Sequence, residues 1–212
     1  MTFETVREIQ KLASPMKQIV TPFITLLITL LAGNSVGQSF VLPAPDGWGK
    51  ETISFPIDFA LDIPYVGTEE LRFTPGWGNA KTEEYWSYCF LWMINDDAQV
   101  DGASLGKHLK SYYDGLVGRN IVSRKIEQSK VVPIISNVEA TLGRDANYTY
   151  EGTVSMLDYM EQKPITLQIK IHQARCDETK KKIIFVEVSP QSSPHRVWKE
   201  FESIWKGFKC KP

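Results

Sequence analysis

The stretch GASLG at residues 102–106 has the spacing of a catalytic serine. In hydrolases that carry G-x-S-x-G, the serine lies on a sharp turn directly after a strand, and a histidine accepts its proton. Ser104 with His172 or His195 would supply these two groups. The strand pattern before the motif ends near Ile94, well ahead of Ser104, so we expect this serine to begin a helix. A small serine hydrolase is therefore the alternative interpretation of the chain.

The acidic stretch INDDAQVDG, which holds Asp96, Asp97 and Asp101, is the second candidate. Its acidity is that of a calcium loop, but it lacks the ligand spacing of such a loop, D-x-D-x-D-G followed by a distant glutamate. We expect turn and helix-capping roles for these aspartates, with a weak calcium site as the alternative. The cysteines and histidines show no zinc-site spacing, and no pattern in the sequence indicates a cofactor.

Trp48 and Trp77 each lie between glycines, in DGWGK and PGWGN. Flanking glycines allow a sharp turn, which either pushes an indole outward or folds it under a loop. An outward indole is a platform for a sugar ring or a peptide, so these two tryptophans are the candidate ligand-binding residues. The other interpretation is that each indole anchors its loop over the core.

Residues 1–37 are expected to be an upstream extension followed by a signal peptide. The apolar run at 19–32 has 14 residues. A transmembrane helix needs about 20 residues, whereas the core of a signal peptide has about 7–15. Small residues follow the run, so we expect cleavage after Gly37. A start at Met16 instead of Met1, and retention of the segment as an anchor, are both open from the sequence.

The remaining residues, 38–212, have the size of one domain with its own core. The whole chain has 24 basic and 25 acidic residues, without basic clusters, which argues against nucleic acid as the main partner. We expect a secreted or periplasmic protein with an extracytoplasmic ligand, such as a glycan or a peptide. Contact with a membrane is expected only through the signal segment before cleavage.

Three cysteines lie in this domain, and an oxidising compartment permits one disulfide between them. Cys89 lies inside the apolar run YWSYCFLWMI and has the surroundings of a small core residue. Cys176 ends an expected strand, and Cys210 follows the last expected helix. Both therefore lie at the ends of elements, where a disulfide can join two elements. We therefore predict a Cys176–Cys210 disulfide and a buried Cys89 thiol.

Alternating apolar residues predict six strands, and one further segment is apolar on both faces. Residues 85–94 form that segment, and such a strand is normally central and covered on both sides. We therefore expect Trp86, Phe90 and Trp92 to be core residues, with a ligand groove lined by the aromatic residues of this segment as the alternative. The alternating strands are expected at about 53–63, 71–73, 138–142, 148–156, 165–171 and 182–188.

Two helices are predicted. The first begins at Asp101 or Ser104 and runs to about Val117, and the second opens with Ser193 as its cap and Pro194 at its first position. Apolar residues spaced by three and four form one stripe on each helix. The stripes are Leu105, Leu109, Tyr112 and Leu116 on the first helix, and Val197, Phe201, Ile204 and Phe208 on the second.

The resulting order, β-β-β-α-β-β-β-β-α, predicts an α+β fold in which a mainly antiparallel sheet is packed by two helices. LPAPDGW near the start of the domain and HRVWKEFESIWKGF at its end resemble the Mog1/PsbP-like α/β/α sandwich. EELRFTPGW, EEYWSYCFLWMI and SPQSSPHRVW together resemble an uncharacterised family of secreted bacterial proteins. The first resemblance implies a compact, non-enzymatic binding or accessory module, and it transfers no functional residue. A non-catalytic binding protein is thus the leading expectation.

Overall fold

The computed structural model of the protein describes residues 40–95, 97–141 and 149–211. The chain divides into two units, residues 1–36 and 37–212, and every described residue belongs to the second unit. The expected extension, signal segment and cleavage site therefore lie outside the described residues. Within the described ranges, no helix is both long enough and apolar enough to cross a membrane.

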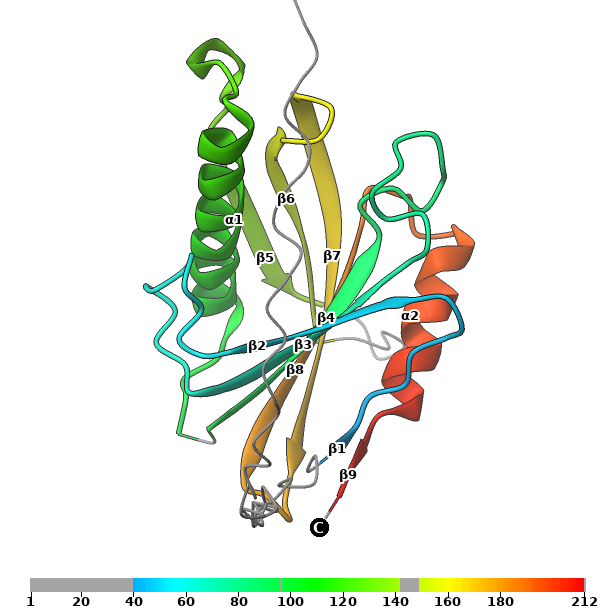
Figure 1. The fold of residues 1–212 in the computed structure, drawn as a ribbon. Helices are drawn as coiled ribbons and strands as arrows, with labels where there is room; N and C mark the ends of the chain where they lie inside the picture. The colour runs from blue at the N-terminus through cyan, green and yellow to red at the C-terminus, as the bar shows by residue number, and fades with distance from the viewer. Residues whose placement is uncertain (1–39, 96, 142–148, 212) are drawn as a thin grey trace, which may run out of the picture. The chain divides into compact units, whose positions relative to one another are not determined.

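The domain is an α+β fold built on a seven-stranded antiparallel sheet with the strand order β2-β3-β4-β8-β7-β6-β5. Figure 1 shows helix α1 on one side of this sheet and helix α2 on the other. The predicted order of elements is confirmed, and a small two-stranded sheet, β1 with β9, adds to it. The elements are β1 (Phe40–Val41), β2 (Gly49–Ser54), β3 (Gly67–Phe73), β4 (Tyr88–Asn95), α1 (Gly102–Arg124), the 3₁₀ helix η1 (Gln128–Lys130), β5 (Ile135–Ala140), β6 (Tyr150–Asp158), β7 (Lys163–Cys176), β8 (Lys181–Ser189), α2 (Arg196–Gly207) and β9 (Lys209–Cys210).

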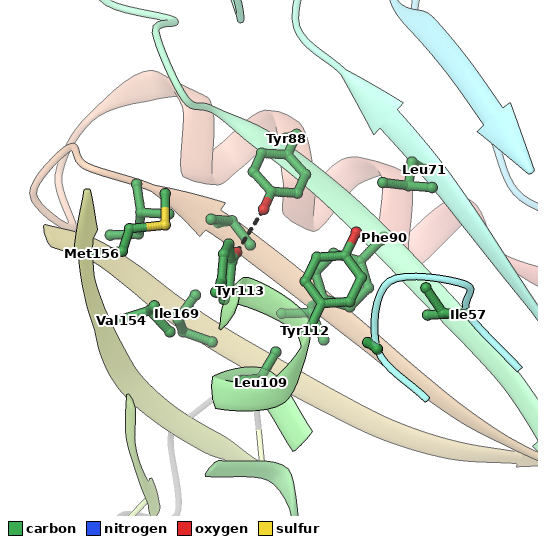
Figure 2. Packing of buried hydrophobic residues seen from close by; sticks show 14 of the residues in the cluster. Ile57, Leu71, Tyr88, Phe90, Leu109, Tyr112, Tyr113, Val154, Met156 and Ile169 are labelled. Carbon is green, nitrogen blue, oxygen red and sulfur yellow. Dashed lines mark hydrogen bonds between the residues drawn. The ribbon is translucent and has the colours of Figure 1, made fainter. Parts of the chain in front are cut away.

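Strand β4 lies in the middle of the sheet and is covered on both faces, as its sequence predicts. Phe90 and Trp92 are fully buried in the cluster on the α1 side, and Cys89 and Leu91 are fully buried in the cluster on the α2 side. Successive side chains of a strand point to opposite faces, so one apolar strand supplies both cores. Figure 2 shows the α1 side, where residues of β4 meet those of α1.

Helix α1 begins where the sequence places it but ends later. Asp101 is its N-cap and accepts a hydrogen bond from the Ser104 amide at 2.8 Å, while the Ser104 hydroxyl accepts one from the Asp101 amide at 2.8 Å. The expected end near Val117 is wrong, because the helix continues to Arg124 and closes at Lys125 in a left-handed conformation. A single glycine, Gly118, costs a helix only about 1 kcal/mol, so it does not stop the helix.

Helix α2 begins three residues after Ser193, so the prediction of Ser193 as its cap is wrong. The N-cap is His195, whose Nδ1 accepts a hydrogen bond from the Val197 amide at 3.3 Å. Because His195 supplies the acceptor, the Ser-Pro pair remains in the turn before the helix. Three residues of the predicted stripe, Val197, Phe201 and Ile204, are buried against β4 and β8. The fourth, Phe208, lies just after the helix as its C-cap.

The strand expected at 53–63 is also wrong beyond its start. β2 ends at Ser54, and a loop from Phe55 to Val66 leaves the sheet. Pro56 has no amide hydrogen for a ladder bond, so the strand cannot continue normally through it. Ile57 and Ile63 are buried because the loop folds over the α1-side core, not because they alternate in a strand.

The predicted disulfide is confirmed. Cys176 at the end of β7 is bonded to Cys210 in β9, with 5.7 Å between their Cα atoms. β9 also pairs with β1, where Cys210 lies opposite Phe40, so both ends of the described domain meet beside this bond. Cys89 is a buried free cysteine, and burial raises the pKa of its thiol well above the usual value.

Candidate functional site

The structure does not bring the candidate catalytic residues together. The Ser104 hydroxyl is engaged in the capping box of α1. His172 lies on the other side of the sheet, where its Nε2 is 2.8 Å from a Glu187 oxygen and its ring contacts Trp205 at 5.1 Å between centroids. His195 caps α2 and contacts the exposed Glu83 at 3.3 Å. Since α1 and α2 cover opposite faces, neither histidine is placed to accept a proton from Ser104.

The acidic stretch likewise serves local structure. Asp101 caps α1, and its hydrogen bonds lower the pKa of its carboxyl group, chiefly the bond from the Ser104 amide. Asp97 lies in the turn before the helix, and Asp96 is outside the described residues. Across the described residues, no group of three or more His, Cys, Asp or Glu side chains is arranged to hold a metal ion.

The two candidate tryptophans have different surroundings. Trp48 packs edge-on against Phe201 of α2, at 5.9 Å between ring centroids, which is the geometry of a loop anchor. Trp77 is half-buried, contacts the rings of Phe73 and Trp86 at 4.9 and 5.9 Å, and lines a pocket. Its Nε1 is buried and has no hydrogen-bond partner among the described residues.

This pocket has a volume of about 490 Å³ and lies on the α1 side of the sheet. It is bounded by the C-terminal half of α1, by β2, β3 and β4, and by the β6–β7 turn. A volume of this size is typical of small-molecule sites. The pocket is lined by Glu51, Ile53, Phe59, Leu71, Phe73, Trp77, Trp86, Tyr88, Tyr112, Leu116, Arg119, Asn120, Ser123, Arg124, Tyr159 and Met160.

The wall contributed by α1 changes character along the helix. Leu105, Leu109 and Tyr112 are buried against the sheet, and the same face continues through Leu116 to polar residues. These are Arg119, Asn120 and Ser123, at helical spacings of three, four and seven from Leu116, together with Arg124. A helix face that points toward a sheet is normally apolar, because it packs there. Here the polar part faces the pocket instead.

The opposite wall is aromatic. Phe73, Trp77, Trp86 and Tyr88 contact one another in tilted, edge-on and stacked pairs. Trp86 has φ = 53°, a left-handed conformation that is rare for a bulky residue. Such strain persists only where the surroundings enforce it, and it is enriched at ligand-binding sites. Trp86 is buried, as its sequence predicts, but it is also part of the pocket wall.

Two arginines lie at the pocket. The Arg119 guanidinium is 4.1 Å from the centre of the Phe59 ring and 3.5 Å from an Asp58 oxygen. Arg124 lies 5.3 Å from the centre of the Tyr159 ring, and its Nε donates to the Asn120 oxygen at 3.3 Å. Burial raises the pKa of Tyr159 to about 12, against an opposing effect of the two arginines, so its phenol is neutral.

One carboxyl group is buried just behind the pocket. Glu69 is fully buried in β3 opposite Ile53 of the pocket wall, and it accepts a hydrogen bond from the Trp92 Nε1 at 3.1 Å. Burial raises its pKa to about 8, an effect that hydrogen bonds from Trp92 and Tyr112 oppose and the charge of Glu51 reinforces. Glu69 is therefore mostly protonated at neutral pH.

The sequence indicates Trp77 as a candidate and leaves open a groove lined by the aromatic residues of 85–94, two of which, Trp86 and Tyr88, line the pocket. It does not reveal the part of the wall that α1 and the Phe59 loop supply. The helix was expected to end near Val117, so Arg119, Asn120 and Ser123 had no assigned element. The usable signal was the spacing from Leu116 to Ser123, which continues the inward stripe with polar residues. The alternating pattern predicts a strand at Phe59, whereas the structure has a loop there, so the sequence does not indicate that Phe59 lines a pocket.

Comparison with protein-family models finds no match, and comparisons with curated proteins and with solved structures find none either. The chemistry of the pocket therefore has to be judged from its own residues. Its lining holds aromatic rings, three of them phenols, two guanidinium groups, an amide, a serine hydroxyl and one carboxylate. This set can bind and orient a molecule.

Proposed function

We propose that the protein is a secreted or periplasmic, non-catalytic binding protein that takes its ligand into the pocket between α1 and strands β2–β4. The observation that carries this proposal is the polar stripe of α1 facing an aromatic wall across an open volume. In a domain built only for stability, the space between a helix and a sheet is filled by apolar side chains. A helix face that exposes Arg119 and Ser123 to such a space is the arrangement expected of a binding site.

Two further observations support the compartment and the absence of catalysis. The Cys176–Cys210 disulfide suits an oxidising environment, and the apolar run at 19–32 suits an export signal. The resemblance to the Mog1/PsbP-like sandwich also implies a binding or accessory module. The serine hydrolase alternative needs Ser104 within hydrogen-bond reach of a histidine, and no such contact occurs in the described chain.

A fluorescence titration with N-phenyl-1-naphthylamine, an uncharged apolar probe, tests the proposal. We expect saturable binding at one site per chain. Ser123→Trp places a large side chain at the pocket from an exposed helical position, so binding should be lost. Val122→Trp, one residue earlier and 79% exposed, is the matched control and should bind normally. Equal binding by both variants, or no saturable binding by the wild type, would contradict the proposal.

Export has its own test. The intact mass of the protein recovered from outside the cytoplasm should correspond to a chain that begins at Gln38, after loss of residues 1–37. A chain that retains these residues and stays in the cytoplasm would refute the proposed location, while leaving ligand binding to be judged by the titration.

A further inference from the structure

We propose that the ligand of this pocket is an organic anion, with an apolar, ring-containing body against the aromatic wall and a carboxylate or sulfonate group bound by Arg124 and Arg119. This inference rests on the proposed function and narrows it from an unspecified ligand to a chemical class. Two observations support it. Aromatic residues line one side of the pocket, and the arginines on the other side have few or weak partners within the described chain.

The body of the ligand is set by the aromatic wall. Phe73, Trp77, Trp86 and Tyr88 present ring faces and edges, and Leu71 and Met160 add apolar surface. Aromatic surfaces bind other rings through stacked and edge-on contacts, and they gain from excluding water. A volume of about 490 Å³ suits a compact molecule, not a folded segment of another protein.

Arg124 is the group most available to an acidic substituent. It is the last residue of α1 and is exposed, and its partners in the described chain are the Asn120 amide oxygen and the Tyr159 ring. No carboxylate within the described ranges forms an ion pair with it. Its planar guanidinium offers two parallel donors, which match the two oxygens of a carboxylate or a sulfonate.

Arg119 can join it. Its ion pair with Asp58 is at the surface, where the Asp58 side chain is 83% exposed, and surface ion pairs of this kind contribute little. The guanidinium is held over the Phe59 ring, so it is already oriented at the pocket. Arg119 and Arg124 are five residues apart on one helix, and the Asn120 amide and Ser123 hydroxyl lie between them.

The distribution of charge favours an anion over a neutral sugar. Two guanidinium groups line the pocket from α1, and the one acidic lining residue, Glu51, lies on β2 across from them. Sugar sites need acceptors for many hydroxyl groups, whereas the polar side of this pocket offers mainly donors. A neutral ligand would leave Arg124 without a counter-charge and Arg119 with only its surface pair to Asp58, whereas an anion supplies a counter-charge to both.

Two probes that differ only in charge test this inference. 8-Anilinonaphthalene-1-sulfonate has the same ring skeleton as N-phenyl-1-naphthylamine plus one sulfonate. We expect wild-type protein to bind the sulfonate probe about tenfold more tightly, the effect of one charge-assisted hydrogen bond near a surface. Arg124→Gln should remove most of this preference, Arg119→Gln a smaller part, and neither should change the affinity for the uncharged probe.

Lys107→Gln, which removes a positive charge from α1 outside this pocket, is the matched control and should keep the full preference. Equal affinity for the two probes, or a preference that Arg124→Gln leaves unchanged, would overturn the inference while the proposed binding function stands. Failure of both probes to bind at a site blocked by Ser123→Trp would overturn both. Stronger binding of the uncharged probe would point to a neutral ligand such as a glycan.

Discussion

The two faces of the sheet are covered in different ways by one helix each. On the α2 face, Val197, Phe201 and Ile204 are buried against the sheet, and a disulfide fixes the chain soon after the helix. A pocket on this face, of about 530 Å³, lies at the start of the helix, and Trp198 is the one aromatic residue among those that line it. On the α1 face, the first half of the helix is packed in the same way, but its second half borders an open pocket. The aromatic wall and the two arginines of the α1-side pocket are the difference that supports our proposal of a ligand site on this face.

The buried carboxyl groups of the two faces also differ in their partners. On the α2 face, Glu187 contacts His172 at 2.8 Å, and Glu70 contacts Arg72 at 3.2 Å. On the α1 face, Glu69 receives a hydrogen bond from Trp92, which is a neutral group. A buried carboxylate without a positive partner is costly, so Glu69 holds its proton to a higher pH.

The largest difference is expected when one phenylalanine on each face is replaced by alanine and the losses in unfolding free energy are compared. Phe201→Ala should lower the free energy of unfolding by about 3–5 kcal/mol, because this ring is fully buried in a filled cluster. Phe59→Ala should cost about 1 kcal/mol, because the ring is half-buried at the pocket. Urea unfolding measures both values. Similar costs for the two variants would mean that the faces are packed alike.

Glu69→Gln should change how stability depends on pH. The folded-state pKa of about 8 lies above the ordinary 4.5, so the folded protein binds more protons than the unfolded chain between these values. Wild-type stability should therefore fall as the pH rises from about 4.5 to about 8, by about 5 kcal/mol at most. The variant lacks this loss, so it should be the more stable protein at pH 9.

Urea unfolding of both proteins at several pH values measures this difference, and Glu139→Gln, at an exposed position, is the control. If the difference in unfolding free energy between wild type and Glu69→Gln stays constant up to pH 9, the prediction is wrong. A positive group near Glu69 would then stabilise its ionised form.

Removal of the disulfide should affect the α2 side. The bond joins residues 34 positions apart, and chain entropy for such a loop gives about 3–4 kcal/mol. The Cys176→Ser, Cys210→Ser double variant should lose this amount in thermal or urea unfolding. Below its unfolding temperature it should still bind N-phenyl-1-naphthylamine, because the pocket lies on the other face. Loss of binding in a folded double variant would show that the two faces are coupled.

Modest effects of opposite sign are expected from a pair of glycines in α1. A methyl group at Gly115 would overlap the carbonyl oxygen of Phe59, whereas one at Gly118 would meet open space. Gly118→Ala should stabilise the protein by about 0.5–1 kcal/mol through helix propensity. Gly115→Ala should destabilise it by about 1–3 kcal/mol and weaken probe binding, because the Phe59 loop must move. Melting temperatures that rise in both variants would show that the loop does not contact α1.

The parts of the fold that could be predicted are the elements whose own pattern of apolar residues is regular. β4 reads as a central strand because both of its faces are apolar, and α2 reads as a surface helix because its stripe is clear. The disulfide followed from the position of Cys176 and Cys210 at element ends. In these places the local pattern and the tertiary environment agree.

The pocket could not be predicted because no single element contains it. Its walls come from β2, β3, β4, α1, the Phe55–Val66 loop and the β6–β7 turn, and only the folded chain brings them together. Phe59 alternates with polar residues like a strand residue, yet Pro56 directs it into a loop. Arg119 and Ser123 look like ordinary exposed helix residues until the sheet that they face is known.

The tryptophan indoles offer the most direct test of where a ligand binds. The six tryptophans divide equally: Trp77, Trp86 and Trp92 belong to the α1 side, and Trp48, Trp198 and Trp205 to the α2 side. Their indole N–H signals in a ¹H–¹⁵N spectrum, assigned by single Trp→Phe variants, can be followed during titration with N-phenyl-1-naphthylamine. We predict saturable shifts for Trp77 and Trp86 and unchanged signals for Trp48, Trp198 and Trp205. Shifts confined to the α2-side signals would contradict the assignment of the α1-side pocket as the binding site.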